Sequence, residues 1–412
     1  MGNPSAFKSY ATWKVSMQKV ALDLVPLSPG RGGGGGGVTR YSIELLQSLS
    51  ELCHQLDFEL VVFAQPGQIV DVQSFSLVEV NIDVTGILRR LLWVHLILPV
   101  LCLVMRIDVL HKLATECPIA LPGTKLVVTV HDFMTEFLSD NFVDTKLKAG
   151  PLKFMHSAYF RLIAKRALSR SNFVIVPSNS VGDEAIKRFG PRPNLYTIYN
   201  GINRPSAGLN QCAPRYIDCQ APLRIAYIAS FSPHKGHFQA LAGIELFAKL
   251  NPQYSTRLQV EFRGHVVDVD YHRDFLFRSS SSVLRNEIHF INYSSTVSVT
   301  DLYASADIVM LLSMYEGFGL PPAEAQAHGV PVICSDMEPF HEVLQDGALY
   351  VDSADPSQIA HAIHAVVSQQ DATSARTQAG VRNSQRFTWS KTADKTARVY
   401  RHALAKSAEN CR

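Results

Sequence analysis

The sequence predicts an α/β protein built from two doubly wound domains in series. Its 412 residues exceed what one ordinary hydrophobic core accommodates. Short runs rich in valine and isoleucine alternate with amphipathic stretches of helical period throughout the chain, and this alternation is typical of parallel sheets covered by helices. With 47% hydrophobic and 18% charged residues, the composition is that of a globular protein.

The order of the apolar runs predicts where the two domains lie. A loose stretch with Pro205, Gly208 and Pro214 separates the two sets of runs. We expect an N-terminal Rossmann-like domain at 17–205, a C-terminal one at 215–385 and a final helical segment at 386–412, returning toward the first domain. The expected strands are 20–27, 59–63, 126–130 and 174–177, then 224–229, 259–263, 288–293, 307–312 and 331–334.

Composition excludes several classes of partner. The net charge of +3 is too small for a protein that coats nucleic acid, so no nucleic-acid partner is expected. The 7 cysteines form no CxxC pair and indicate reduced thiols of a cytoplasmic protein, with no metal site. The N-terminus lacks the layout of a signal peptide. The apolar run 91–105 is shorter than the roughly 20 residues of a membrane span, which favours a buried or interfacial helix.

The strongest motif is EGFGLPPAEAQAHGVPVICS, which starts at Glu316 and follows the predicted strand 307–312. Pro321 and Pro322 suit the first turn of a helix, whose free amide groups attract an anion such as a diphosphate. Glu316 precedes this helix, and Glu324 is expected in its first turn, where both carboxylates can bind sugar hydroxyls. The alternative is that Glu324 only complements the helix dipole and that Glu316 is surface charge.

A second motif, IASFSPHKG, also follows a predicted strand and precedes a helix. Its Lys235 can stabilise the charge that develops on a departing diphosphate. The alternative is an exposed, solvated lysine.

Two further loops lie at predicted strand ends. The loop GRGGGGGGVTRY brings backbone amides of Gly36 and Gly37 close to a bound phosphate or sugar, or else is a disordered linker. His131 and Asp132 follow the strand 126–130, where an imidazole can bind a sugar hydroxyl or carry a proton, or can be a structural group.

Together these motifs resemble glycosyltransferase family four. The two glutamates, Glu316 and Glu324, and the SPHKG run are similar to that family's signature, and the resemblance implies the GT-B fold: two Rossmann-like domains facing each other, with the acceptor on the first and a nucleotide sugar on the second. The resemblance also implies a reaction that retains the anomeric configuration of the sugar and that needs neither a cofactor nor a metal. Family members often carry an arginine five or six residues before the lysine, where this chain has Ala229 and Ser230; Arg263 is a candidate replacement.

The resemblance also implies roles for individual residues. His131, Glu316 and Lys235 are the expected catalytic residues. Glu324 is expected to bind the ribose and Glu316 to lie beside the donor sugar. The expected donor-binding residues are Gly36, Gly37, Ser230, Lys235, Arg263, Glu316, Gly317, Phe318, Gly319, Leu320 and Glu324. The glycine loop, the His131–Asp132 pair and the run RRLLWVHLILP look similar to bacterial mannosyltransferases of surface polysaccharide, which implies GDP-mannose as donor and a glycan or lipid-linked acceptor.

The segment 145–182 contains seven basic and no acidic residues, with aromatic residues among them. Such a segment either docks on anionic lipid at the inner face of the cytoplasmic membrane or presents a solvated charged surface.

Three other functions fit parts of the sequence. A metal-dependent GT-A transferase would use the DxD triplet 268–270, which lacks the expected strand-loop context. A Rossmann oxidoreductase would need an acidic residue after the second strand, where Gln65 and Pro66 stand. An inactive module that only binds sugar nucleotides is the third alternative.

Overall fold

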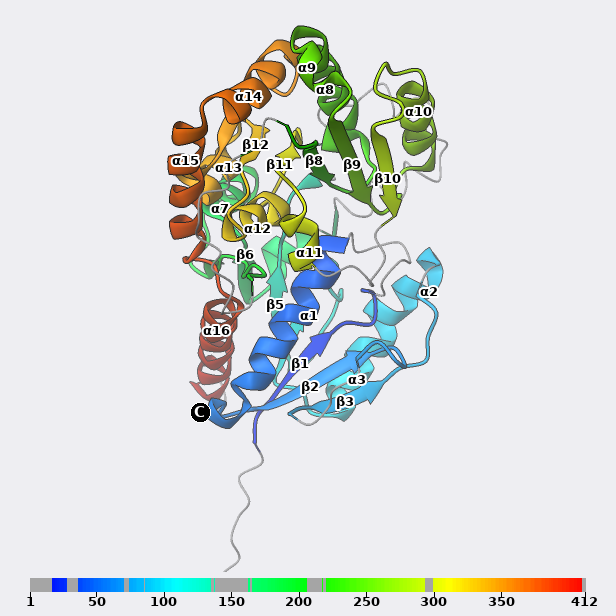
Figure 1. Cartoon of the computed structure of the whole chain (residues 1–412). Coiled ribbons are helices and arrows are strands. Elements are labelled where there is room, and N and C mark those ends of the chain that lie inside the picture. The colour runs from blue at the N-terminus through cyan, green and yellow to red at the C-terminus, as the bar shows by residue number, and fades with distance from the viewer. Residues whose placement is uncertain are drawn as a thin grey trace, which may run out of the picture.

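The computed structural model describes residues 17–27, 36–69, 74–84, 86–134, 137, 162–163, 165–205, 217, 220–292 and 299–409. Two parallel sheets follow one another along the chain, and Figure 1 shows them as separate halves that meet where α11 (Val299–Ala304) and α12 (Leu320–Ala327) lie. The predicted two-part α/β architecture is therefore confirmed. Gly30 to Gly35 of the glycine loop, 145–161 of the basic segment and 206–216 of the expected junction lie outside the described residues.

The N-terminal sheet has the strand order β3-β2-β1-β4-β5-β6-β7. Its strands are parallel, and the central ones are buried on both faces because helices cover each side. The bounds are β1 Lys19–Asp23, β2 Glu59–Ala64, β3 Ser76–Glu79, β4 Val109–Lys112, β5 Lys125–Thr129, β6 Phe173–Val176 and β7 Leu195–Thr197.

Successive residues of the N-terminal strands point to opposite faces, so the sheet packs into two hydrophobic clusters. One face packs against α1 (Gly36–Glu51) and α16 (Trp389–Glu409). The other packs against a π-helical segment (Trp93–Ile97), α3 (Leu98–Val104) and α7 (Asn179–Phe189). The helix α2 (Ile87–Leu92) directly precedes the π-helical segment. The last helix of the chain thus belongs to the core of the N-terminal half, beside α1 in Figure 1.

The C-terminal sheet has the strand order β10-β9-β8-β11-β12-β13. Side chains from its strands and from the helices around it form one hydrophobic cluster of this half. Its strands are β8 Leu223–Ile228, β9 Leu258–Gly264, β10 Ile288–Asn292, β11 Ile308–Leu311, β12 Val332–Ser335 and β13 Leu349–Val351. The remaining helices of this half are α8 His237–Leu250, α9 Pro252–Ser255, α10 Val269–Ser280, α13 Glu338–Leu344, α14 Pro356–Ser368 and α15 Gln370–Ser384.

Several expected elements need correction. The first strand ends at Asp23 rather than Leu27, since the chain turns there and the Asp23 carboxylate accepts a hydrogen bond from the backbone N–H of Val25. The helix expected at 91–105 begins at Ile87 and ends at Val104. The structure also contains β3, β4, β7 and β13, which the apolar runs did not predict.

Candidate functional site

The strand order of the C-terminal sheet places two of the predicted motifs side by side. Neighbours β8 and β11 flank the point where the order of the strands reverses, and ligands of open α/β sheets bind at the carboxyl ends of such strands. The chain after β8 carries Lys235 in a short 3-10 turn, Pro233–Lys235. The chain after β11 carries Glu316. The two motifs are distant in sequence but meet at this sheet edge.

Lys235 and Glu316 form an ion pair. The Nζ atom of Lys235 lies 2.6 Å from Oε1 of Glu316, and the same oxygen accepts a hydrogen bond of 2.7 Å from the Ser313 hydroxyl. Both charged side chains are mostly buried, with 17% and 13% of their surface exposed. The site therefore contains an ammonium group that is held in one place yet still reaches solvent.

Backbone geometry brings the two loops this close. Gly236 follows Lys235 with φ of 69°, and a Cβ atom there would lie 2.1 Å from the carbonyl oxygen of Leu312, at the end of β11. Only glycine fits that position. Gly319 has φ of 83° and forms the N-cap of α12, whose first turn contains Pro321 and Pro322 as expected. The helix thus begins just after the loop that carries Glu316, and in its first three residues only Leu320 has a backbone N–H, because Pro321 and Pro322 have none.

Glu324 lies in the second turn of α12, not the first as expected, because the helix starts at Leu320. Its carboxylate is 1% exposed and accepts hydrogen bonds from Arg40 of α1 (2.5 and 3.0 Å), the Tyr303 hydroxyl (3.0 Å) and the Asn203 backbone N–H (3.2 Å). Burial raises the pKa of Glu324, while the Arg40 guanidinium opposes that rise. Arg40 belongs to the N-terminal half, so this pair joins the two halves.

The buried pair gives a prediction for stability. Replacing Arg40 with methionine leaves the Glu324 carboxylate without its cation, and we expect the free energy of unfolding to fall by about 3 kcal/mol. Urea unfolding measures the change. The control is Arg398→Met, which removes an exposed pair with Asp394 and should change stability little. Equal midpoints for the Arg40 variant and the parent would show that the pair is not formed in solution.

Gly317 brings the loop after β11 against the N-terminal half. A Cβ atom at Gly317 would lie 2.0 Å from the carbonyl oxygen of His131, and the Gly317 carbonyl accepts a 2.6 Å hydrogen bond from the Ser178 hydroxyl. The adjacent Tyr315 hydroxyl donates to Glu184 at 2.6 Å and accepts from the Phe133 backbone N–H at 2.9 Å. The predicted site residues His131, of the N-terminal half, and Gly317, of the C-terminal half, are thereby held in contact.

His131 lies at the carboxyl end of β5, as expected. Its Nε2 atom is 2.9 Å from the carbonyl oxygen of Leu113. Its ring packs edge-on against that of Tyr41, with 4.7 Å between the ring centroids. A carbonyl only accepts, so Nε2 carries the proton and Nδ1 the lone pair. Burial lowers the pKa of His131 to about 4, so the imidazole is neutral at pH 7. It is therefore an acceptor at Nδ1. Burial raises the pKa of the neighbouring Asp132 carboxyl group.

The other predicted donor-binding residues are less closely gathered. Gly36 and Gly37 begin α1, and a Cβ atom at Gly36 would lie 3.3 Å from the His265 ring, which follows β9 in the other half. Phe318 is buried against the rings of Tyr199 and Phe387. Ser230 is half-buried at the end of β8. The Arg263 guanidinium forms an ion pair with Glu261 at 2.5 Å. That Arg263 takes the place of the arginine that family members often carry before the lysine stays a prediction.

His237, at the start of α8, predicts sensitivity to acid. It is fully buried and stacks on Phe231 at 4.6 Å, and burial lowers its pKa from the ordinary 6.5 to about 3. Below pH 6.5 the unfolded chain binds a proton here that the folded chain does not, so the folded state loses stability as pH falls. We expect this residue to cost about 2 kcal/mol at pH 5 relative to pH 7.5.

The test compares urea unfolding at both pH values for the parent, His237→Phe and His361→Phe, an exposed control on α14. The stability of the His237 variant should fall less with acid than that of the parent and the control. An identical loss in all three proteins would disprove the prediction.

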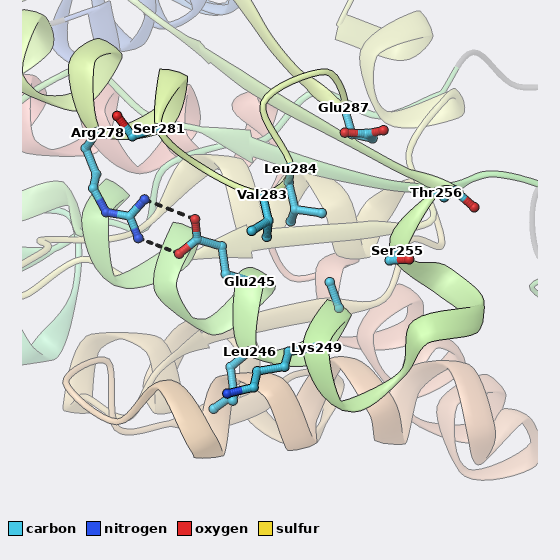
Figure 2. Close-up of a pocket in the computed structure, with 11 residues that line it drawn as sticks. Glu245, Leu246, Lys249, Ser255, Thr256, Arg278, Ser281, Val283, Leu284 and Glu287 are labelled. Carbon is cyan, nitrogen blue, oxygen red and sulfur yellow. Dashed lines mark hydrogen bonds and ion pairs between the residues drawn. The ribbon is translucent and has the colours of Figure 1, made fainter.

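Two further features of the C-terminal half take no part in the ion pair between Lys235 and Glu316. The carboxylate of Asp268 caps α10 by accepting from the Tyr271 backbone N–H, and Asp270 pairs with Arg273, so both acids of the DxD triplet have structural partners. An open groove of about 910 Å³ lies between α8, α9 and α10. Figure 2 shows that the pair Glu245–Arg278 lines it, and none of the predicted site residues does.

Sequence reasoning missed the partners that cross between the halves. Arg40 stands inside the glycine-loop motif, yet nothing in the sequence indicates that it reaches Glu324. Glu342 of α13 is another case: its carboxylate accepts from the backbone N–H groups of Asn179 and Ser180, at 2.6 and 2.9 Å, and so caps α7 of the N-terminal half.

Comparison with known proteins agrees with this geometry. The model of the family described as "Glycosyltransferase Family 4" matches residues 35–204, and that of "Glycosyl transferases group 1" matches residues 220–403. The O-antigen chain mannosyltransferase RfbU of Salmonella typhimurium is 27% identical over an alignment of 363 residues, and the match covers 83% of this chain and 90% of that protein.

Solved structures of the same fold cover nearly the whole chain. Sucrose-phosphate synthase from Thermosynechococcus elongatus has a TM-score of 0.70 at 18% identity, covering 94% of this chain and all (100%) of that one. WaaG, a glycosyltransferase involved in lipopolysaccharide biosynthesis, has a TM-score of 0.68 at 14% identity, covering 92% and 98%. With the two family models matching its two halves, and with paired Rossmann-like sheets of the GT-B fold, this chain belongs to glycosyltransferase family four.

Proposed function

We propose that this glycosyltransferase moves a hexose, with mannose from GDP-mannose as the first choice, to a glycan or lipid-linked acceptor in surface polysaccharide or lipopolysaccharide synthesis. One observation carries the proposal: Lys235 and Glu316 meet at 2.6 Å at the point where the strand order reverses, next to the start of α12. The 27% identity with an O-antigen chain mannosyltransferase supports the choice of sugar and of pathway.

The proposed roles follow from the geometry. The Lys235 ammonium and the amides of Phe318, Gly319 and Leu320 stabilise the negative charge on the leaving diphosphate. Glu316 accepts hydrogen bonds from the donor sugar, and a neutral His131 accepts one at Nδ1. These groups supply positive charge and orientation without a metal ion, so the transfer is proposed to be metal-independent.

Glu324 is proposed to bind the ribose hydroxyls. A carboxylate has about four sites that accept hydrogen bonds. Arg40, Tyr303 and Asn203 already donate four hydrogen bonds to it. Ribose binding would therefore displace at least one donor, and we assign the exchange to Arg40, a long side chain that is 22% exposed.

The proposed reaction retains the anomeric configuration. The bond between sugar C1 and the diphosphate oxygen breaks, and the acceptor oxygen bonds to C1 on the same face. The acceptor's proton passes to an oxygen of the leaving diphosphate, which serves as the base. No side chain of the described site is an evident nucleophile, so we propose no covalent intermediate between sugar and protein. We assign acceptor binding to residues 17–205 and donor binding to residues 215–385. Residues 386–412 are assigned to a C-terminal helix that returns toward the N-terminal domain. We place the protein in the cytoplasm.

The test offers the purified protein GDP-mannose or UDP-glucose with undecaprenyl-diphosphate-linked sugar acceptors, with and without a chelator. The proposal expects mannosylated product from GDP-mannose, unaffected by chelator, and an axial glycosidic linkage by NMR. Product formed with UDP-glucose but not with GDP-mannose would overturn the proposed donor. An equatorial linkage would overturn the proposed retention of configuration, and loss of activity with a chelator would overturn the proposed metal independence. Donor binding without any transfer would indicate an inactive module.

A further inference from the structure

An apolar stripe runs along the outside of the helix Ile87–Val104, which is long and apolar enough to cross a membrane by length and composition. The stripe comprises side chains that are 45–78% exposed: Leu88, Leu92, Leu96, Val100, Leu103 and Val104. Positions four apart drift around an α-helix by about 40° at each step. The π-helical segment Trp93–Ile97 holds more residues per turn and offsets that drift, which keeps the stripe on one face.

The opposite face of the same helix belongs to the core of the N-terminal half. Trp93, Val94, Leu98 and Cys102 are buried against the sheet, and the Trp93 indole donates to the Asp23 carboxylate. Leaving the core would expose all of these groups, so the helix cannot cross a bilayer while the fold is intact. A helix packed on a sheet normally has a polar outer face. Here the outer face is apolar instead.

Neighbouring segments extend the stripe and surround it with positive charge. Ile119 is 56% and Leu162 is 64% exposed. The Arg166 guanidinium donates to the Ile119 carbonyl at 2.7 Å and acts electrostatically on His95, which places the helix after Leu162 beside the stripe.

The charges around the stripe are mainly basic. The sequence from 86 to 106 contains Arg89, Arg90 and Arg106 but no aspartate or glutamate. Lys165 and Arg170 are exposed on the neighbouring helix. Acidic groups also face this region: Glu116 forms a buried pair with Arg90, and Asp83 pairs with Arg89.

We infer that the apolar stripe docks the protein on an anionic lipid bilayer, with the helix Ile87–Val104 lying in the interfacial plane. The stripe inserts among acyl chains, and the basic side chains at its margins meet lipid phosphates. Charge decides between this occupant and a second copy of the chain, because two basic surfaces repel each other. The sequence-based expectation placed membrane contact at 145–182; the stripe moves its centre to 87–104.

None of the stripe residues is among the proposed transfer-site residues, and binding to lipid can be measured without a sugar donor. The full-length protein is sedimented with vesicles of phosphatidylcholine, with or without phosphatidylglycerol. The test variant combines Leu92→Gln, Leu96→Gln and Val100→Gln. The matched control combines Val269→Gln, Phe277→Gln and Val283→Gln, side chains of the C-terminal half that are 71–79% exposed. All six positions are exposed, so both variants should fold, which circular dichroism checks.

The parent and the control should bind vesicles containing phosphatidylglycerol, and the stripe variant should bind at least about tenfold more weakly. Lys165→Gln and Arg170→Gln should each weaken binding about fivefold on those vesicles and have little effect on phosphatidylcholine alone. Equal binding by the stripe variant and the control would overturn the inference. A parent that is dimeric by light scattering, and monomeric in the stripe variant, would also overturn it by assigning the stripe to a second copy.

Discussion

Replacing Lys235 with methionine is expected to lower the rate of sugar transfer about 100- to 1,000-fold, the usual loss when one group that stabilises a developing anion is removed. The ammonium lies 2.6 Å from Glu316 and remains partly exposed to solvent. Without it, the leaving diphosphate loses its cation, and the Glu316 carboxylate adds an uncompensated negative charge at the same place. Initial rates with saturating donor measure the effect.

Two further variants separate charge from bulk folding effects. Lys235→Arg keeps a cation but changes its shape, and we expect it to recover part of the rate. Lys249→Met removes an exposed lysine near the other end of α8 and should leave the rate unchanged. In thermal-shift assays, nucleoside diphosphate should stabilise the parent and the Lys249 variant but not the Lys235 variant. A rate within threefold of the parent for Lys235→Met would contradict its proposed role.

The second large effect is expected from Gly317→Ala. The added Cβ atom would lie 2.0 Å from the His131 carbonyl oxygen, a distance that no folded protein tolerates, so the loop after β11 or the end of β5 must move. Movement of that loop displaces Glu316, and misplacement by about 1 Å can cost 100-fold in rate. We expect a loss of transfer of that order and a decrease in stability of about 1–3 kcal/mol.

The control for this variant is Gly86→Ala, at a position with ordinary φ and no atom within 4 Å of the added Cβ. It should retain the rate and the melting temperature of the parent. If Gly317→Ala also retained both, the two halves would not approach each other in solution as they do at His131.

Strands with strong apolar runs were predictable, and those with polar or short sequences were not. The strand β4 is fully buried, yet its last two residues are His111 and Lys112. Lys112 pairs with Asp23 of β1, and His111 hydrogen-bonds to Tyr400 and Thr129 at 2.6 and 2.8 Å. The partners that allow these two polar side chains to be buried come from other elements. The sequence of β4 alone therefore does not resemble that of a buried strand. The outermost β7 and β13 have only 3 residues each, too few for a periodic signal.

The candidate site shows the same division. Each motif predicted its own loop and helix start, since glycine and proline determine local backbone geometry. The contact of Lys235 with Glu316 depends on the order of β8 and β11 in the sheet, which follows from the fold. The pairing of Arg40 with Glu324 depends on how the halves approach, and that approach is set by contacts such as Ser178 with Gly317. No local pattern encodes it.

The most direct test of the proposed site is a crystal structure with the donor's nucleoside diphosphate bound. We predict that the terminal phosphate lies about 3 Å from the Lys235 ammonium and from the backbone N–H groups of Gly319 and Leu320. The ribose hydroxyls should contact Glu324, with at least one of its present hydrogen bonds broken. A nucleotide bound elsewhere, for example in the groove lined by Glu245 and Arg278, or a ribose far from Glu324, would contradict the account.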